Sequence, residues 1–271
     1  MKKYWFVFCK TDLMIERLPD GSYTIPCQDE SPVPIKEWIT VHKVSLPSRL
    51  QSNDSCDTEC RAFNIPFPIT DKEHYEMCPL RASYHKLPLD LYLMAGKCQE
   101  ILYWDTNTRY CGVCGGTMKL HTDISKRCIE CGKEIWPQLA TAVIVLITRI
   151  ENGVEKVLLV QSKSFKSNYY GLVAGFVETG ETLEEAVRRE VKEEVGYEIK
   201  GLRYYGSQPW PYPCGLMVGF FAEYAGGKFH LQHSELGRGG WFTRDNLPPI
   251  PEKLSIARKL LDTWINEDKK L

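Results

Sequence analysis

The spacing of hydrophobic residues predicts strands and helices in turn along this chain. Near its beginning, short β-rich runs lie at Tyr4–Phe8 and Trp38–Val44, and turn-forming residues separate them. Over Leu89–Trp104 apolar residues recur at intervals of three and four, which predicts a helix with one buried face. Residues 1–105 are therefore predicted to form a smaller N-terminal α+β domain.

A β-hairpin is predicted just past the middle of the chain. The two apolar runs Leu139–Thr148 and Lys156–Gln161 flank an Asn152-Gly153 pair, which is typical of a tight hairpin turn. Both runs are too short to cross a membrane, so they are expected to pair as neighbouring strands.

Two helices and three further strands complete the predicted pattern. Helical spacing appears between Thr182 and Gly196 and again from Glu252 to Asn266. The further strands are expected near Leu202–Tyr205, Leu216–Tyr224 and Gly240–Phe242. Strands that alternate with two helices indicate a mixed sheet between helices, an α/β/α fold, over residues 137–271.

The first of these two helices has clear end signals. Thr182 followed three residues later by Glu185 is a capping-box pattern, and Gly196 supplies a stop. An apolar stripe for packing on the sheet is formed by Leu183, Ala186, Val187 and Val191.

Carboxylates share the apolar stripe of this helix. Each residue advances by about 100° around the axis, so Glu190 and Glu194 fall within roughly 20° of Leu183, with Glu193 on the flank. Carboxylates crowded at the edge of a core repel one another and lose hydration, a cost that a divalent cation removes. Mg²⁺ and Mn²⁺ prefer oxygen ligands and keep water in their shell, which suits a substrate phosphate. The alternative is a solvated charged face, which the inward direction of Glu190 and Glu194 disfavours.

Two Cys-x-x-Cys pairs precede this region. They are Cys111 with Cys114 and, thirteen residues later, Cys128 with Cys131, and a glycine follows each pair. Four thiolates in this arrangement fit tetrahedral zinc with no open position, which predicts a structural zinc ribbon over residues 106–136. The alternative use of a ribbon is nucleic-acid binding, but few basic side chains surround these pairs.

Several of these residues resemble the signature of a known enzyme family. Gly175, Glu181 and the run Arg189–Gly196 resemble the signature of the Nudix hydrolases, which cleave a nucleoside diphosphate linked to another group. The segment Ser207–Pro213 resembles the SQPWPFP element of the NADH pyrophosphatase branch, with Tyr212 in place of phenylalanine. The resemblance implies the Nudix α/β/α sandwich and hydrolysis of NADH or NAD⁺ to AMP and nicotinamide mononucleotide. Members of this branch also remove NAD caps from RNA.

The resemblance also implies roles for the acidic residues. As ligands of a catalytic Mg²⁺ or Mn²⁺ it implies the carbonyl of Ala174 and the side chains of Glu190, Glu194 and Glu235. It makes Glu193 the residue that activates water or holds a further metal ion. Arg189 precedes Glu193 by one helical turn and is expected to orient it.

Substrate contacts are implied by the same resemblance. From the proline-rich segment and its continuation they are Gln208, Pro209, Trp210, Pro211, Tyr212, Pro213, Cys214 and Gly215. Elsewhere they are Arg81, Asp123, Trp136, Phe176 and Ala257. Phe176 and Trp136 are expected to offer aromatic surfaces to nicotinamide or adenine. In the family the aromatic residue after the ribbon can come from a second subunit, which implies a homodimer. For any one of these residues alone, the alternative is core packing or a solvated surface position.

Composition excludes several other classes of function. The 271 residues carry a formal net charge of −1, so no overall field draws the chain to nucleic acid or to a membrane. No apolar stretch approaches the ~20 residues of a membrane span, and the apolar run Tyr4–Cys9 ends before it reaches the length of a signal peptide. A cytoplasmic protein is therefore expected. The seven cysteines outside the ribbon are odd in number and irregular in spacing, which predicts free thiols.

Three functions fit the sequence. The first is a metal-dependent NAD(H) diphosphatase. The second is a Nudix hydrolase that acts mainly on ADP-ribose, a dinucleoside polyphosphate or NAD-capped RNA. The third, from a different class, is a nucleic-acid-binding module with an inert Nudix domain, which predicts a broken carboxylate set, whereas this sequence keeps Glu190, Glu193 and Glu194. No GxGxxG loop opens a helix, so the dinucleotide is not expected as a redox cofactor.

Overall fold

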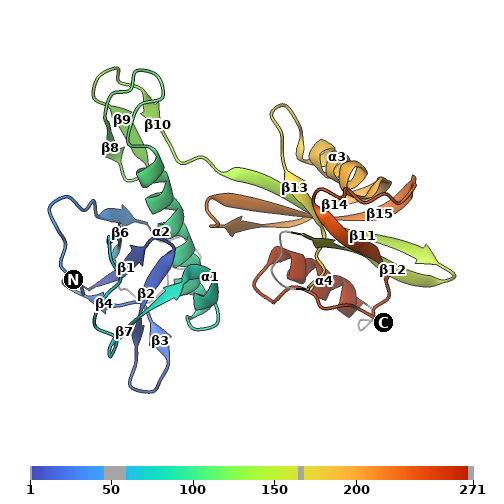
Figure 1. Cartoon of the computed structure of the whole chain (residues 1–271), viewed down its shortest axis with the longest axis horizontal. Helices are drawn as coiled ribbons and strands as arrows, with labels where there is room; N and C mark the ends of the chain where they lie inside the picture. Colours follow the sequence, from blue (N-terminus) through green and yellow to red (C-terminus); the bar gives the residue numbers. More distant parts are fainter. Residues whose placement is uncertain (1, 46–58, 164–167, 268–271) are drawn as a thin grey trace. The chain divides into compact units, whose positions relative to one another are not determined.

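The chain divides into two units in the computed structural model (Figure 1). The structure describes residues 2–45, 59–163 and 168–267. Unit 1 comprises Met1–Gln138 and Pro211–Cys214, and unit 2 comprises Leu139–Trp210 and Gly215–Leu271. The short segment Pro211–Cys214 therefore belongs to unit 1 by its contacts, although the strands on either side of it belong to unit 2.

Unit 1 begins with a mixed seven-stranded sheet. The strands in spatial order are β3 (Tyr23–Thr24), β2 (Asp12–Arg17), β1 (Lys3–Cys9), β6 (Glu59–Asn64) and β5 (His42–Val44). Two short strands pair beside this path, β4 (Cys27–Gln28) with β1 and β7 (Tyr75–Pro79) with β2. In β1, Trp5 and Val7 join one core cluster, and Phe6 and Phe8 are also fully buried, so both faces of this strand are covered.

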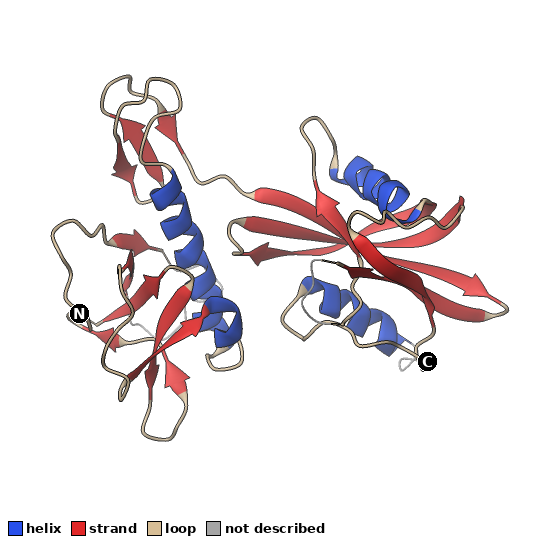
Figure 2. Ribbon diagram, viewed as in Figure 1, coloured by secondary structure: helices blue, strands red, loops and turns tan. Residues whose placement is uncertain are grey.

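The helix predicted in the N-terminal region is confirmed. A short α1 (Leu80–Ser83) precedes α2 (Leu89–Asn107), which Figure 2 shows as the long helix beside the strands of unit 1. The residues that recur at helical spacing are buried along it, among them Met94, Ala95 and Cys98. The periodic apolar face thus packs as the sequence predicts.

The strand predicted at Trp38–Val44 is wrong over its first half. Only β5, His42–Val44, is a strand, because Ile39 donates its amide to the carbonyl of Lys36 in a turn. Ile39 still packs against the core as a partly buried residue. Its apolar character therefore reflects burial of a loop and not strand pairing.

The ribbon region folds as a small three-stranded sheet within unit 1. Its strands are β8 (Met118–Thr122), β9 (Ser125–Cys128) and β10 (Glu134–Ile135), in the order β10-β9-β8. All pairings are antiparallel. This sheet is too small to bury enough apolar surface for stability on its own, and a bound metal ion would stabilise it.

Unit 2 contains the mixed sheet that the sequence predicts. The strands in spatial order are β14 (Tyr197–Trp210), β15 (Gly215–Gly227), β11 (Ala140–Glu151), β12 (Val154–Ser162) and β16 (Leu236–Phe242). The short strand β13 (Val173–Phe176) pairs with β11. The pair β11–β15 is parallel and the others are antiparallel. The predicted hairpin is formed by β11 and β12.

Two helices cover the faces of this sheet, α3 (Leu183–Val195) on one and α4 (Ile256–Glu267) on the other (Figure 2). Alternation along β11 explains the two cores: Val143 and Val145 join the cluster under α3, whereas Ile144 and Leu146 join the cluster under α4. The α/β/α arrangement is thereby confirmed. None of the described helices combines the length and the apolar character needed to cross a bilayer.

The proline-rich segment differs from the prediction of a loop over 207–213. Its first half continues β14, where Ser207 pairs with Val218 and Trp210 pairs with Gly215. The sheet accommodates Pro209 because β14 is an edge strand. Proline has no N–H group to donate, and on the open side of an edge strand no neighbouring carbonyl needs that hydrogen bond. Only the segment Pro211–Cys214 forms the turn.

Candidate active site

The helix α3 begins and ends as its sequence signals predict. The Thr182 hydroxyl accepts a hydrogen bond from the Glu185 amide at 3.2 Å, and the Glu185 carboxylate accepts one from the Thr182 amide at 2.8 Å. Gly196 ends the helix with φ of 73°, a left-handed conformation in which an added Cβ would overlap the Lys228 carbonyl. These ends fix which residues of α3 face the sheet.

The predicted direction of the carboxylates is confirmed. Glu194 is 4% exposed, and the side chain of Glu190 is 13% exposed, whereas that of Glu193 is 52% exposed. The helix therefore holds two carboxylates at the edge of its buried face and a third at the border with solvent. This placement follows from the ends of the helix and its period of 3.6 residues.

Glu194 has a buried oxygen without a partner. Its Oε2 makes no hydrogen bond, and the backbone N–H of Ala174 on β13 donates to the carboxylate. Burial, followed by the charges of Glu190 and Glu235, raises the pKa of Glu194 to about 8. An unpaired buried carboxylate oxygen is costly, so its presence marks a position suited to a cation.

Glu190 lies against the backbone of Gly175. A Cβ added at Gly175 would overlap the carboxyl group of Glu190, so only glycine allows this approach of β13 and α3. Burial raises the pKa of Glu190, and the neighbouring Arg189 only partly offsets that rise. The signature glycine is thus explained by space for a carboxylate and not by a special φ angle.

Arg189 holds the acidic residues in fixed positions. Its Nε and Nη2 donate to the two oxygens of Glu181 at 2.6 and 2.9 Å, and its Nη1 donates to Glu190 at 2.8 Å and to Glu193 at 3.1 Å. Its Nη2 also donates to the carbonyl of Phe176 at 2.9 Å. The expected contact between Arg189 and Glu193 is therefore present.

Glu181 is a residue of the site to which the sequence assigned no role. The hydrogen bonds from Arg189, with a further one from the Glu178 amide, lower the pKa of Glu181 to about 2. Its spacing of eight residues from Arg189 gives no helical signal, because Glu181 precedes the helix. Only the folded loop shows that this carboxylate anchors the guanidinium group.

Glu235 approaches the site through a loop attached to the end of α3. The Gln232 amide donates to the Glu194 carbonyl at 2.9 Å, and the Lys163 amide donates to the Glu235 carbonyl at 2.8 Å. The Glu235 charge raises the pKa values of both Glu190 and Glu194, which places its carboxylate in their neighbourhood. Glu235 is exposed, so it faces the site from the solvent side.

These residues fit a hard divalent cation. The available donors are carboxylate and carbonyl oxygens, one of them buried without a partner, which is the set that Mg²⁺ and Mn²⁺ prefer. Among the described residues only the four ribbon cysteines form a compact cluster of metal-ligand atoms. The glutamates are spread more widely, as mutual repulsion between like charges requires.

The candidate substrate residues of unit 2 lie in different environments. Phe176 is 65% exposed beside the carboxylates. Gln208 is buried and donates from its Nε2 to the Leu254 carbonyl at 2.9 Å, while its Oε1 has no partner. Ala257 is buried in the core under α4, on the face of the sheet opposite α3. Ala257 packs in this core, and its predicted contact with the substrate stays a prediction.

The turn Pro211–Cys214 packs on α2 within unit 1. The Tyr212 hydroxyl lies 2.6 Å from the Tyr92 hydroxyl, and Pro211 lies so close to Gly96 that an added Cβ there would approach it to 3.0 Å. Tyr212 thus uses the oxygen atom that phenylalanine would lack. A second group of candidates in this unit is exposed: Arg81, Asp123 and Trp136.

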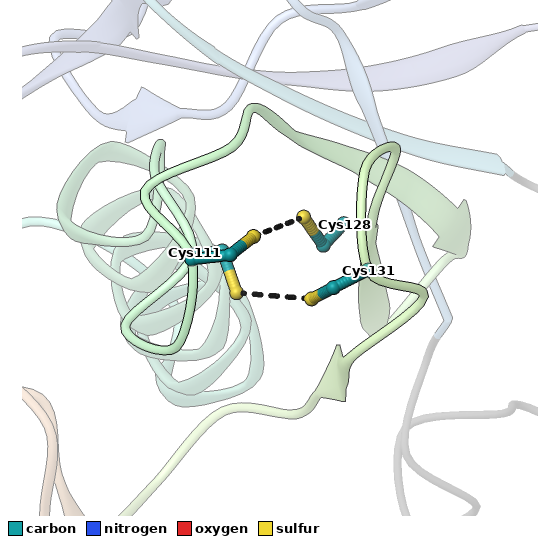
Figure 3. Close-up of side chains that lie close together, drawn as sticks. Cys111, Cys128 and Cys131 are labelled. Carbon is teal, nitrogen blue, oxygen red and sulfur yellow. Dashed lines mark hydrogen bonds between the residues drawn. The ribbon is translucent and has the colours of Figure 1, made fainter.

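The four ribbon cysteines form the predicted cluster. Figure 3 shows three of them, Cys111, Cys128 and Cys131, with their side chains pointing toward a common centre. Their sulfur atoms all lie within 4.8 Å of one another; the Cys111 and Cys131 sulfurs are 3.7 Å apart and the Cys114 and Cys128 sulfurs 3.5 Å. A tetrahedral zinc ion with Zn–S bonds of about 2.3 Å requires sulfur separations near ~3.8 Å. The arrangement therefore suits zinc.

Each Cys-x-x-Cys pair forms a tight turn, or knuckle, that ends at the glycine after it. Gly115 and Gly132 have φ angles of 75° and 74°, a conformation that favours glycine. The backbone N–H groups of Cys114 and Val113 lower the pKa of Cys111 to about 7, which favours the thiolate that binds metal. Outside the cluster the predicted free thiols are confirmed for Cys9, Cys60, Cys78, Cys98 and Cys214, and Cys56 lies outside the described residues.

Family models match both units. The NUDIX domain model matches residues 138–264, and the model described as an NADH pyrophosphatase-like rudimentary NUDIX domain matches residues 2–104. A crystal structure of a NUDIX hydrolase from Nitrosomonas europaea aligns with a TM-score of 0.51 and 23% identity, covering 60% of this chain and 93% of that one. That likeness supports the fold alone.

Curated relatives share a much higher identity. The NAD-capped RNA hydrolase NudC of Pseudomonas aeruginosa (strain LESB58) is 42% identical over 188 residues, which cover 69% of this chain and 66% of the relative. The NAD-capped RNA hydrolase NudC of Vibrio vulnificus (strain CMCP6) is 38% identical over 192 residues, 70% of this chain and 72% of the relative. With its four-cysteine cluster and signature helix, the chain belongs to the NADH pyrophosphatase-like branch of the Nudix hydrolases, the branch of NudC.

Proposed function

We propose that this chain hydrolyses the pyrophosphate bond of NADH or NAD⁺, giving AMP and nicotinamide mononucleotide, and removes NAD caps from RNA. The observation that carries the proposal is the pair of Glu194, which is buried and has a carboxylate oxygen without a partner, and the half-buried Glu190 on the same helix. The relatives named NAD-capped RNA hydrolase support the choice of substrate.

Glu190, Glu194, Glu235 and the Ala174 carbonyl would hold Mg²⁺ or Mn²⁺. When bound, such an ion withdraws electron density from phosphate oxygens and makes water a usable nucleophile near neutral pH. Glu193 accepts the proton of the attacking water, and Arg189 keeps Glu193 in place through the 3.1 Å hydrogen bond. Water attacks phosphorus and the P–O bond of the pyrophosphate breaks, with no covalent intermediate on the protein.

The proline-rich segment is the proposed recognition element for the dinucleotide. Trp210 ends β14, and the turn after it is fixed by the contact between Tyr212 and Tyr92. Proline residues limit the backbone freedom of this turn, so little entropy is lost when a flat ring binds to it. Phe176, exposed beside the carboxylates, is the proposed aromatic surface in unit 2.

The homodimer and the cytoplasmic location stay predictions. In support of the dimer, Trp136 is 50% exposed, which leaves its indole ring accessible to a second subunit. The free thiols are typical of a reducing compartment. Light scattering on the purified protein measures the oligomeric state directly.

Product analysis with a panel of substrates tests the proposed function. The zinc-loaded protein is incubated with NADH, NAD⁺, ADP-ribose, a dinucleoside polyphosphate or NAD-capped RNA in the presence of Mg²⁺ or Mn²⁺. We expect equal amounts of AMP and the mononucleotide from NADH or NAD⁺, and RNA with a 5′-monophosphate from the capped RNA. Cleavage of only ADP-ribose or a dinucleoside polyphosphate would instead support the second function, and folded protein that cuts no substrate would support the binding module.

Replacing Gly175 by alanine is expected to slow hydrolysis by about 10- to 100-fold while the fold is kept. The added Cβ overlaps the Glu190 carboxyl group and must displace it from the site. Steady-state release of AMP measures the effect. The matched control is Gly206→Ala in β14, where an added Cβ meets nothing within 4 Å. Equal activity of both variants would show that the position of Glu190 is not critical.

A further inference from the structure

Unit 1 contains a cavity of about 660 Å³, and none of the four ribbon cysteines lines it. Five parts of the unit line it: the segment before β5 with Trp38, the end of β6 with Asn64, the C-terminal end of α2 with Asp105 and the residues after it, β8 with Lys119, and β9 with Lys126. This volume lies within the range of small-molecule sites. None of the proposed catalytic or substrate-binding residues lines the cavity.

Two aromatic side chains of the cavity are unusually exposed. Trp38 is 68% exposed and Tyr110 is 72% exposed. Neither ring packs against another aromatic ring among the described residues. Large flat rings that face an open cavity offer stacking surfaces for a planar ligand. Any of the nucleotide bases can stack on such a ring, because every base has a flat π face.

The charges that line the cavity favour an anion. Among the described residues that line it, only Asp105 is acidic, and its carboxylate is already paired with the Lys126 ammonium group at 2.6 Å and lies 3.2 Å from Nε2 of the buried His42. The other two cations, Arg109 and Lys119, form no ion pair with a described residue. The cavity therefore presents two exposed positive charges that form no ion pair within the described part of the chain.

Lys126 neutralises the C-terminal end of α2, which would otherwise repel an anion. The carbonyls at the C-terminal end of α2 carry partial negative charge, which would repel a phosphate group. Lys126 donates to the carbonyls of Asp105 and Thr108 at 2.7 and 3.1 Å, and its side chain is almost fully buried. The buried charges of the cavity are thus paired with each other and with the helix end, whereas the charges of Arg109 and Lys119 are exposed.

We propose that this cavity is a second ligand site and binds a nucleotide, with the base against Trp38 or Tyr110 and the phosphate at Arg109 and Lys119. The guanidinium group of Arg109 can bind a phosphate with two parallel hydrogen bonds. The side chains of Asn64 and Thr117 line the same cavity and supply polar groups for the edge of a base. This site goes beyond the proposed catalytic function because it requires no hydrolysis. Its ligand is either a free mononucleotide or one nucleotide of an RNA strand.

Calorimetric titration of the zinc-loaded full chain, without added Mg²⁺ or Mn²⁺, tests the site. The probes are AMP, a five-nucleotide RNA with a 5′-phosphate, and inorganic phosphate. We expect AMP or the RNA to bind more tightly than phosphate, because the rings contribute stacking. Tighter binding of the RNA identifies a strand as the source of the nucleotide, whereas equal or tighter binding of AMP identifies the free nucleotide.

Variants then locate the binding. We expect the affinity for whichever of AMP and the RNA binds more tightly to fall about 10-fold or more in each of Trp38→Ala, Arg109→Ala and Lys119→Ala. The matched controls are Phe67→Ala, an aromatic residue that is 77% exposed, and Lys36→Ala, an exposed lysine; neither lines the cavity. The controls should bind as the parent does, and all variants should keep its zinc content and unfolding temperature.

Two results would overturn the proposal. One is the absence of binding by both AMP and the RNA. The other is binding that survives all three cavity substitutions, which would assign it to the proposed catalytic site. Hydrolysis of NADH by Trp38→Ala is measured in parallel and should equal that of the parent, so failure of this site and failure of the proposed function give different results.

Discussion

Replacing Glu194 by glutamine should slow AMP release from NADH by about 100-fold or more, equivalent to roughly 3 kcal/mol in the activation barrier. Glutamine has nearly the same shape and keeps an oxygen that can accept from the Ala174 amide. It removes the negative charge at the point where a buried carboxylate oxygen has no partner. The loss should therefore appear in the rate with Mg²⁺ or Mn²⁺, and the fold should be kept.

Glu198→Gln is the matched control for this prediction. Glu198 directly follows the first residue of β14, its side chain is 66% exposed, and it pairs with Lys192 at 3.1 Å on the protein surface. Its replacement removes the same charge without touching the buried pair, so activity should stay within about twofold, because exposed ion pairs contribute little. Similar rates for the two variants would show that Glu194 does not hold the metal ion.

Replacing Cys128 by serine should abolish zinc binding and destabilise unit 1. Cys128 is 2% exposed, and its sulfur lies 3.5 Å from that of Cys114. Serine oxygen is a poor substitute for a thiolate, and structural zinc contributes about 10–16 kcal/mol of apparent binding energy in small zinc-finger peptides. We expect the zinc content to fall from one ion per chain to none and the first unfolding transition to move to lower temperature.

Cys27→Ser is the control for the zinc prediction. Cys27 is a half-buried cysteine on β4, outside the four-cysteine cluster. Its variant should retain zinc in full. Metal analysis after gel filtration and a thermal unfolding scan measure both quantities. Full zinc content in Cys128→Ser with an unchanged unfolding temperature would contradict a structural zinc site.

The sequence determined the features that depend on residues close together in the chain. The capping box at Thr182, the stop at Gly196 and the glycines of the two knuckles each act over a few residues, and each is present in the structure. The helical period alone placed Glu190 and Glu194 on the buried side of α3. The α/β/α fold followed from the same local signals, because strand and helix periods are properties of short segments.

Other predictions failed or were incomplete because the deciding contacts are distant in sequence. Trp38–Val44 has the apolar content of a strand, but half of it packs as a loop against the core of unit 1. The prolines of 207–213 suggested a loop, but the edge position of β14 allows pairing through Trp210. Neither the burial of a loop nor the edge of a sheet is encoded in local spacing.

The tertiary structure decided how the site is held together. The space that Gly175 leaves for Glu190 and the anchoring of Arg189 by Glu181 join segments that are separated by a loop. The approach of Glu235 depends on a loop fixed to the end of α3, and the cavity beside Trp38 depends on several segments of unit 1 that are separate in sequence. The sequence by itself determined which side chains are available and the direction in which one helix presents them, whereas long-range packing alone determined which of them meet, because such contacts depend on the path of the whole chain.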